Sequence, residues 1–263
     1  MDYVLEHKDE ALRLEFQGKL ENYRLDREMN DLHIQPGSRV LDAGCGSGLI
    51  SRYLVDHFPG IDVTACDFSS QRIAQARELA GHSRYGAIRF ETSDLQQLKF
   101  QSWSFDWVVC RFVFEHLGNP QAASDEFFRV LQNGGKIRLI DLDGILFNLH
   151  TRNAELSSML AALQRGWKTD LFVGRKLPAM LKESGFGSIR WEMQPMQFHG
   201  ESLQDERELT RQRLEFIRPT VLSILGSEAL TDRFSELYCS EMLKPEATLF
   251  YNKFIVTAEK PTS

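Results

Sequence analysis

Residues 40–48 read VLDAGCGSG, and this segment decides the fold. An apolar run ends here in three closely spaced glycines, Gly44, Gly46 and Gly48, and the helical pattern LISRYLVDHF follows them. Glycine permits a sharp strand-to-helix turn and a close approach of a ligand to the backbone. The segment therefore predicts a nucleotide-type site at the carboxyl end of a strand, with a tight turn that binds nothing as the alternative.

Short apolar runs alternate with helical stretches from about residue 40 to 142, which is typical of βα units around a parallel sheet. The predicted strands are RVLDAG (39–44), IDVTACD (61–67), IRFETSD (88–94), FDWVVC (105–110) and KIRLID (136–141). The helices between them are expected to begin near Ser47 or Gly48, at Ser69 and Ser70, and at Pro120. Serine caps and proline in a first turn favour these starts.

The segments outside this core are predicted to be mostly helical. Residues 5 to about 32 have Leu12, Phe16, Leu20 and Tyr23 on one helical face, so we expect one helix that packs on the domain. Downstream, a helix is expected over about 148–166. GRKLPAMLKESGF (174–186) predicts another that ends near Gly185, and strands follow at SIRWEM (188–193) and ATLFYNKFIVTAEK (247–260).

About 50 residues separate the last two strands, and their apolar positions recur with helical spacing. We interpret residues 201–245 as a helical insertion, divided by Pro219 and Gly226, that covers the sheet edge. The division we predict is an N-terminal helical cover (1–35), an α/β domain (36–200 and 246–263) and this insertion, which we expect to act as a lid.

Composition and charge exclude several classes of protein. With 42% hydrophobic and 26% charged residues the chain of 263 residues is a folded globular type, and 31 Lys and Arg against 37 Asp and Glu disfavour nucleic-acid binding. No apolar run approaches the roughly 18 residues of a membrane helix, and the N-terminus is charged, so we expect a cytoplasmic protein. The cysteines form no CxxC pair, which favours reduced thiols: Cys45, Cys66, Cys110 and Cys239.

The glycine loop lacks the features of a phosphate-binding loop. A dinucleotide fingerprint G-x-G-x-x-G/A would end at Leu49 or Ser51, and a P-loop needs a Lys followed by Ser or Thr. A ligand without phosphates remains. Asp67, at the end of the second strand, is placed for a ribose diol, and Asp94, at the end of the third, can accept from an exocyclic amine. Each of these acids could instead be a surface or capping residue.

The chain resembles the class I S-adenosylmethionine-dependent methyltransferases over about residues 36–190. The resemblance rests on the order and spacing of VLDAGCGSG, VTACDFS, FETSDLQQLKF, SFDWVVCRFVFEHL, FFRVLQNGGKIRLIDLD and GRKLPAMLKESGF. It implies a Rossmann-like, doubly wound, seven-stranded, mostly parallel sheet with an antiparallel last strand. The small-molecule branch, of the quinone and natural-product type, is the most similar, although Asn133 replaces the proline usual before the glycine pair.

The resemblance also implies S-adenosyl-L-methionine as cofactor and S-adenosyl-L-homocysteine as product. The Gly44 to Gly48 loop would hold the methionine moiety, Asp67 the ribose, and Phe68 and Leu95 would flank an adenine whose amino group binds Asp94, while Arg111 begins the loop beneath the sulfonium. The full set assigned to the cofactor is Asp42, Gly44, Cys45, Gly46, Gly48, Asp67, Phe68, Ser93, Asp94, Leu95 and Arg111.

Two residues are candidates for acid–base chemistry. His116, just past the fourth strand, is the best base for an acceptor that must lose a proton, because its ordinary pKa lies near neutrality. Tyr23 could close over the cofactor and bind the acceptor. A packing or capping role is the alternative for both. Asp141, Asp143 and His150 follow the fifth strand, but no further carboxylate ligand is evident and we predict no metal.

The function expected is methyl transfer to a small organic acceptor, with O-methylation slightly favoured. Neither an NPPY-type motif nor the cysteine pair of cytosine C5 methylation is present. The regions 148–173 and 201–245 are expected to surround the acceptor with aromatic side chains. A protein-directed methyltransferase, a non-methyl reaction at the same site and a non-catalytic cofactor-binding subunit are the alternatives, and a homodimer is possible.

Overall fold

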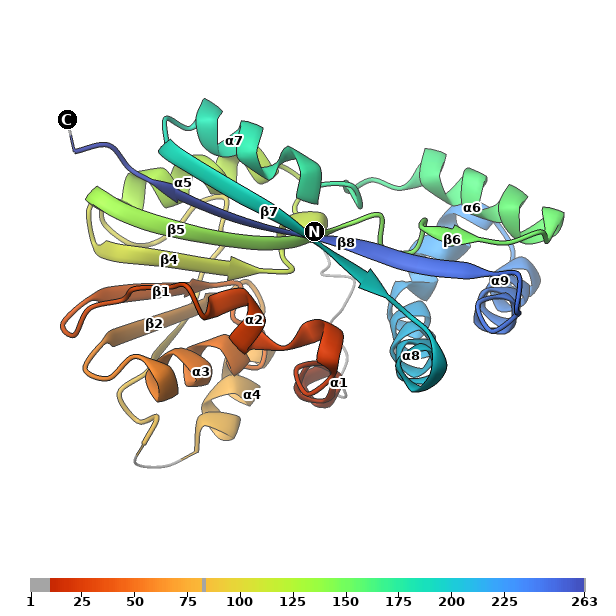
Figure 1. Cartoon of the computed structure of the whole chain (residues 1–263), viewed down its shortest axis with the longest axis horizontal. Helices are drawn as coiled ribbons and strands as arrows, with labels where there is room; N and C mark the ends of the chain where they lie inside the picture. The colour runs from red at the N-terminus through yellow and green to blue at the C-terminus, as the bar shows by residue number, and fades with distance from the viewer. Residues whose placement is uncertain (1–9, 82–83, 263) are drawn as a thin grey trace.

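A mixed sheet with helices on both faces forms the centre of the computed structural model, which describes residues 10–81 and 84–262 (Figure 1). The parallel strands are β1 (Arg39–Ala43), β2 (Asp62–Asp67), β3 (Arg89–Thr92), β4 (Phe105–Arg111) and β5 (Leu131–Asp143). All five occur where the sequence predicts them, although β5 begins earlier.

The remaining strands are β6 (Leu149–His150), β7 (Gly187–Gln197) and β8 (Thr248–Glu259). The order is β3-β2-β1-β4-β5-β8-β6 with β7 on the other edge of β8, and β8 runs antiparallel to each of its neighbours. The predicted doubly wound sheet with an antiparallel last strand is therefore confirmed. β6 is an additional eighth strand, so the predicted helix from residue 148 begins only at Ala154, after Asn153 caps it.

Alternating side chains of the strands bury two apolar layers, one on each face of the sheet. The first layer packs against α5 (Pro120–Val130) and α7 (Leu177–Glu183). The second packs against α2 (Leu25–Met29), α3 (Leu49–His57) and α4 (Ser70–Ala80). Short 3-10 turns, η2 (Phe114–His116) and η3 (Gly174–Lys176), follow β4 and precede α7.

The N-terminal cover is not the single helix that was expected. It consists of α1 (Glu10–Gln17), η1 (Glu21–Tyr23) and α2, while residues 5–9 of the predicted helix lie outside the described residues. Gly18 ends α1 where the chain passes so close to α3 that a β-carbon would lie 2.5 Å from Leu49 Cδ2. Of the predicted apolar face, Tyr23 is buried whereas Phe16 is 39% exposed, so the face packs on the domain only in part.

The insertion forms a second lobe with α6 (Ala154–Gly166), beside the first half of β8 (Figure 1). It contains α8 (Gly200–Leu225) and α9 (Glu228–Glu241). Pro219 does not divide it, contrary to expectation: α8 runs through the proline and ends at Gly226, which has a φ of 74°. Buried Phe216, Ile217 and Val221 on either side of the proline hold the helix together despite the lost hydrogen bond.

Candidate active site

The glycine loop leaves β1 at the carboxyl edge of the sheet in a conformation that favours glycine. Gly44, Gly46 and Gly48 have φ values of 75°, 52° and 76°. At Gly44 the chain passes so near the segment after β4 that a β-carbon would lie 2.5 Å from Val113 Cγ2. The backbone N–H of Cys45 donates to the Cys66 carbonyl at 2.9 Å, which ties the loop to β2. Burial raises the pKa of the Cys45 thiol, so it stays protonated.

Helix α1 lies over this loop. Leu14 Cδ1 is 3.1 Å from the position of a β-carbon on Gly46, and the Ser47 hydroxyl donates to Glu15 Oε1 at 2.8 Å. Arg52 of α3 binds the same carboxylate. The cover is thus hydrogen-bonded to the loop and to the helix that the loop begins.

Two buried carboxyl groups stand at the ends of β1 and β2. Asp67 Oδ2 accepts from the Gly46 N–H at 2.9 Å, and Oδ1 accepts from the Ser69 N–H at 3.0 Å. Asp42 accepts from the Ser51 hydroxyl. Burial raises the pKa of Asp67 and brings that of Asp42 to about 7. Asp67 therefore braces the glycine loop and keeps lone pairs for a ribose diol.

The residues expected around the adenine lie at the ends of β2 and β3. Phe68 is 51% exposed, which is unusual for a large apolar ring, whereas Leu95 is buried. The Ser93 N–H donates to the Asp67 carbonyl at 2.9 Å, and Asp94 Oδ1 accepts from the Gln96 N–H at 2.9 Å. An exposed aromatic ring is a suitable surface for a heteroaromatic base to stack on.

Arg111 is the last residue of β4, as expected, but its side chain binds the N-terminal cover. It donates to both carboxylate oxygens of Glu28 in α2 and to the Tyr23 carbonyl at 2.9 Å. Lys253 of β8 donates to the same carboxylate at 2.7 Å. Glu28 is fully buried and joins the cover to two strands.

His116 ends η2, next to the buried carboxyl group of Glu115, whose Oε1 lies 3.5 Å from His116 Nε2. Burial and the charges of Arg13, Arg72 and Arg213 lower the pKa of His116 to about 4. The imidazole is therefore neutral at physiological pH, so its unprotonated nitrogen can accept a proton. Burial raises the pKa of Glu115 above its ordinary range, so this carboxyl group holds a proton near neutrality.

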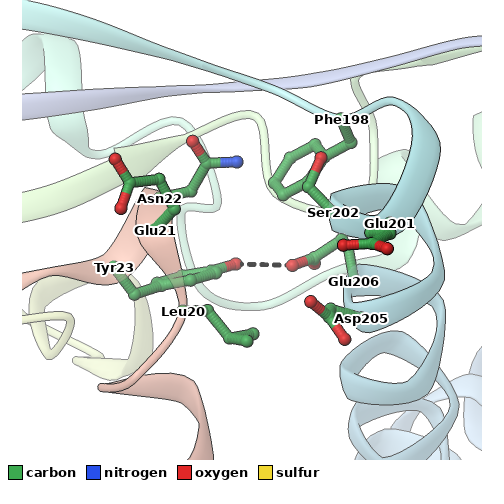
Figure 2. A pocket seen from close by; sticks show the side chains of 9 residues that line it. All are labelled: Leu20, Glu21, Asn22, Tyr23, Phe198, Glu201, Ser202, Asp205 and Glu206. Carbon is green, nitrogen blue, oxygen red and sulfur yellow. Dashed lines mark hydrogen bonds between the residues drawn. The ribbon is translucent and has the colours of Figure 1, made fainter.

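Tyr23 lies under the insertion rather than in the domain core. Its ring meets Phe112, just past β4, edge to face at 6.1 Å, and its hydroxyl donates to Glu206 Oε2 of α8 at 2.8 Å. A pocket of about 220 Å³ opens beside this hydrogen bond, between η1 and α8 (Figure 2). Its lining residues are Leu20, Glu21, Asn22, Tyr23, Phe198, Glu201, Ser202, Asp205 and Glu206.

The two acids at the carboxyl end of β5, Asp141 and Asp143, bind different protein groups. Asp141 accepts from the backbone N–H groups of Val113 and Phe114, and Asp143 is bound by Arg175. Within residues 10–81 and 84–262, no group of three His, Cys, Asp or Glu side chains is arranged to hold a metal. These carboxylates instead anchor η2 and η3 to the sheet.

Sequence reasoning missed the polar side chains that join the cover to the insertion. Glu206 and Arg213 point from α8 toward Tyr23, and Arg213 Nη1 donates to Glu206 Oε1 at 3.3 Å. The signal was present, because both residues share a helical face with apolar Leu209 and Ile217, which are buried. A charged pair on an apolar stripe indicates a buried partner.

The strand order, the antiparallel β8 and a glycine loop at the carboxyl end of β1 define the fold class of the class I S-adenosylmethionine-dependent methyltransferases. Residues 41–139 match the family model described as a methyltransferase domain. This part of the chain is therefore a methyltransferase domain.

Named proteins agree with this assignment. The chain is 33% identical to the demethylmenaquinone methyltransferase of Deinococcus radiodurans over 43% of its own length and 49% of the relative. It is 34% identical to the malonyl-[acyl-carrier protein] O-methyltransferase of Enterobacter lignolyticus over 47% of each protein. The chain thus spans about half the length of these curated relatives.

Solved structures agree on the fold. A Haemonchus contortus phosphoethanolamine N-methyltransferase 2, in complex with phosphomonomethylethanolamine and S-adenosylhomocysteine, superposes with a TM-score of 0.62 at 20% identity, covering 98% of this chain and 59% of that one. The [4+2]-cyclase SpnF superposes with a TM-score of 0.60 at 19% identity, covering 92% and 82%. In the described part of the chain, no helix is long and apolar enough to cross a membrane.

Proposed function

We propose that the protein transfers the methyl group of S-adenosyl-L-methionine to a small organic acceptor. The main observation behind this proposal is the glycine loop at the carboxyl end of β1, whose Gly46 N–H donates to the Asp67 carboxylate. The match of residues 41–139 to methyltransferase domains supports the proposal.

The residues present fit the cofactor. The loop backbone has no β-carbons at Gly44, Gly46 and Gly48 to obstruct a methionine moiety, and Asp67 has acceptor capacity left for ribose hydroxyls. The exposed ring of Phe68 offers a stacking surface. When bound, this cofactor supplies an activated methyl group on a sulfonium that leaves as a neutral thioether.

The chain itself must align the acceptor and exclude water, since an in-line displacement with a good leaving group needs little more. Helix α1 and η1 cover the loop, and the insertion closes over Tyr23. Neutral His116 accepts the proton of a hydroxyl acceptor.

The acceptor we propose is a hydroxyl compound, so that the transfer is an O-methylation. Among the similar proteins, one is named an O-methyltransferase and one an N-methyltransferase, so this preference rests on the availability of a neutral base at His116. We further propose the division into cover (1–35), α/β domain (36–200 and 246–263) and lid insertion (201–245).

The setting we propose is the cytoplasm, with no nucleic-acid partner and a possible homodimer. Free thiols at Cys45, Cys66, Cys110 and Cys239 suit a reducing compartment. The formal net charge of −6 opposes binding to phosphate backbones.

The test is calorimetric titration of S-adenosyl-L-homocysteine into the wild type, Asp67→Ala and Asp62→Ala. Loss of two hydrogen bonds to a carboxylate should weaken binding about tenfold or more in Asp67→Ala. Asp62 stands at the exposed opposite end of β2, so Asp62→Ala should bind like the wild type. A wild type that does not bind at millimolar concentration would refute the proposal.

A second experiment separates the alternatives. Methyl-labelled S-adenosyl-L-methionine is incubated with the protein and either a small-molecule fraction or a protein fraction of cell extract. Label in a small molecule supports the proposal, and label in protein supports the protein-directed alternative. Cofactor binding without transfer to either fraction indicates a partner subunit or a non-methyl reaction.

A further inference from the structure

Five polar side chains from four elements, of which all but Arg213 are buried, meet where the insertion covers the end of the sheet. We name this set the insertion cluster: Tyr23 of η1, Glu115 of η2, Glu206 and Arg213 of α8, and Tyr251 of β8. Glu206 uses one carboxylate oxygen for Tyr23 and the other for Arg213, at 2.8 and 3.3 Å. The Tyr23–Glu206 hydrogen bond also forms one side of the pocket in Figure 2.

Three atoms of the cluster have no partner. Arg213 Nη2, Tyr251 Oη and Glu115 Oε2 are buried, and no hydrogen bond to them comes from the described residues. Negative charge on Tyr251 and Glu115 would raise the pKa of Arg213, so the three groups are close enough to interact. Buried polar atoms almost always have partners, so three such atoms in one cluster are available to the polar atoms of a ligand.

The hydroxyl of the neighbouring Tyr238, in contrast, has a hydrogen-bond partner. Its Oη donates to the Leu146 carbonyl at 3.0 Å, and the side chain is as fully buried as that of Tyr251. Tyr251 packs edge-on against Phe198 of the pocket wall, with ring centroids 5.1 Å apart. Its hydroxyl lies near that of Tyr238 and interacts with it, but it makes no hydrogen bond of ordinary length to a described residue.

The orphan groups are donors, and their surroundings favour an anion. An arginine side chain can only donate, and burial keeps Tyr251 in its neutral form, able to donate. Burial and the nearby charge of Asp141 raise the pKa of Glu115, while Arg213 and Arg13 act in the opposite direction. Arg213 is paired with Glu206 at 3.3 Å, and the charge of Arg13 also acts on Glu115.

We propose that Arg213 and Tyr251 bind an oxyanion group, a carboxylate or a phosphate, of the methyl acceptor. The proposal rests on the proposed function and assigns the acceptor to a chemical class. Arg213 Nη2 and Tyr251 Oη donate to the oxyanion, and protonated Glu115 is a third donor. The acceptor is thereby held under the insertion, next to η2, where His116 stands.

The test uses acetate and inorganic phosphate as probes, titrated calorimetrically into the full-length protein saturated with S-adenosyl-L-homocysteine. At least one of them should bind the wild type, and Tyr251→Phe should weaken that binding about fivefold or more because one hydrogen bond is lost. The preferred probe tells a carboxylate acceptor from a phosphate acceptor. Tyr85→Phe is the control and should bind the probe like the wild type, because the Tyr85 hydroxyl binds Asp56 at the surface and belongs to none of these elements.

Thermal unfolding without anions gives an independent readout. Tyr251 Oη makes no hydrogen bond of ordinary length, so Tyr251→Phe should unfold close to the wild-type temperature, whereas Tyr238→Phe loses the bond to the Leu146 carbonyl and should unfold below it. Arg213→Lys keeps the charge opposite Glu206 and should weaken the probe with little change in unfolding temperature. A Tyr251→Phe variant that is as destabilised as Tyr238→Phe would show a structural hydroxyl and overturn the proposal.

Two further outcomes also overturn it and leave the proposed function standing. One is cofactor binding by the wild type with no binding of either probe. The other is weaker S-adenosyl-L-homocysteine binding by Tyr251→Phe, which would assign these donors to the cofactor. Failure of the wild type to bind S-adenosyl-L-homocysteine refutes the proposed function instead, and the probe titration without cofactor then still decides the subsite.

Discussion

The surroundings of His116 change its pKa, which the sequence alone could not predict. The sequence places a histidine after β4, and its ordinary pKa suggests a base that titrates near neutrality. Three arginines and burial bring the pKa to about 4 instead. The imidazole is thus always ready to accept a proton, but it is a weaker base than an exposed histidine.

For this reason His116→Ala should lower kcat by about 10² to 10⁴ while cofactor affinity stays constant, if the acceptor is a hydroxyl. The acidic limb of the wild-type kcat profile that reports His116 should lie near pH 4 rather than 6.5. Initial rates between pH 4 and 8 measure both effects. A loss smaller than tenfold would mean that alignment alone drives the transfer.

Tyr23 gives a second prediction for a single residue. Tyr23→Phe removes the hydrogen bond to buried Glu206 and should cost about 1–3 kcal/mol, or several degrees in unfolding temperature. Tyr85→Phe is the control, because its hydroxyl binds Asp56 at the surface, where little stability is lost. Equal unfolding temperatures of the two variants would show that the Tyr23 bond does not stabilise the cover.

The elements themselves were predicted unevenly, for physical reasons. β1 to β5 were predictable because each strand is a short apolar run between turn residues. The break at Gly18 was not, since the Leu49 side chain that lies against it comes from a distant part of the chain. β6 depends on pairing Leu149 with Leu249, and helix continuity at Pro219 depends on tertiary packing. The periodicity of apolar residues predicts which face of a helix is buried, but it does not predict where the helix is interrupted.

The same limit applies to the candidate site. The glycine loop and the acids after β1 and β2 follow from local sequence, because strand ends place them. The contacts of Glu28 with Arg111 and Lys253 could not be predicted, because they join residues 83 and 225 positions apart. No local pattern pairs such distant charges.

At the scale of the element, the insertion can be tested by replacing residues 201–245 with a short Gly/Ser linker. Cofactor affinity should stay within a few-fold of the wild type, since the insertion supplies none of the strand-end residues, while acceptor methylation should be lost. The trimmed protein exposes Leu156, Leu163 and Tyr251, so its fold must be checked by circular dichroism. A folded variant that no longer binds cofactor would contradict the lid assignment.

Hydrogen exchange tests the same lid without removing it. α8 and α9 should gain protection when acceptor and S-adenosyl-L-homocysteine are both bound, relative to the free protein. If the amides of α8 are as protected from exchange as those of β4 in the absence of ligands, the insertion is a permanent part of the core and not a lid.

For the whole molecule, buried carboxyl groups make stability depend on pH. Burial raises the pKa of Asp42 and Asp141 to about 7, so the folded state holds protons that the unfolded state releases above about pH 4. That stabilisation is complete below pH 4 and is lost as pH rises through 7. His116 acts in the opposite direction, because the unfolded state binds its proton first between pH 6.5 and 4.

The carboxyl groups outnumber the histidine, so the protein without cofactor should unfold at a lower temperature at pH 8 than at pH 5.5. With about 1.4 kcal/mol per pKa unit, Asp42 alone accounts for roughly 2 kcal/mol, or about 4–8 °C. Scanning calorimetry at both pH values measures this, and Asp42→Asn should reduce the difference. A wild type that is more stable at pH 8 would show that these carboxyl groups are ionised in the folded state.

The position of the insertion within the β7–β8 hairpin has a consequence for how such a protein can diversify. The chain leaves the sheet at Gln197 and returns at Phe250, its direct partner across the two strands. Both ends of the excursion are therefore side by side on a rigid scaffold, far along the chain from the glycine loop. Recombination at these two points would exchange one helical insertion for another while the glycine loop and the strand ends are inherited unchanged.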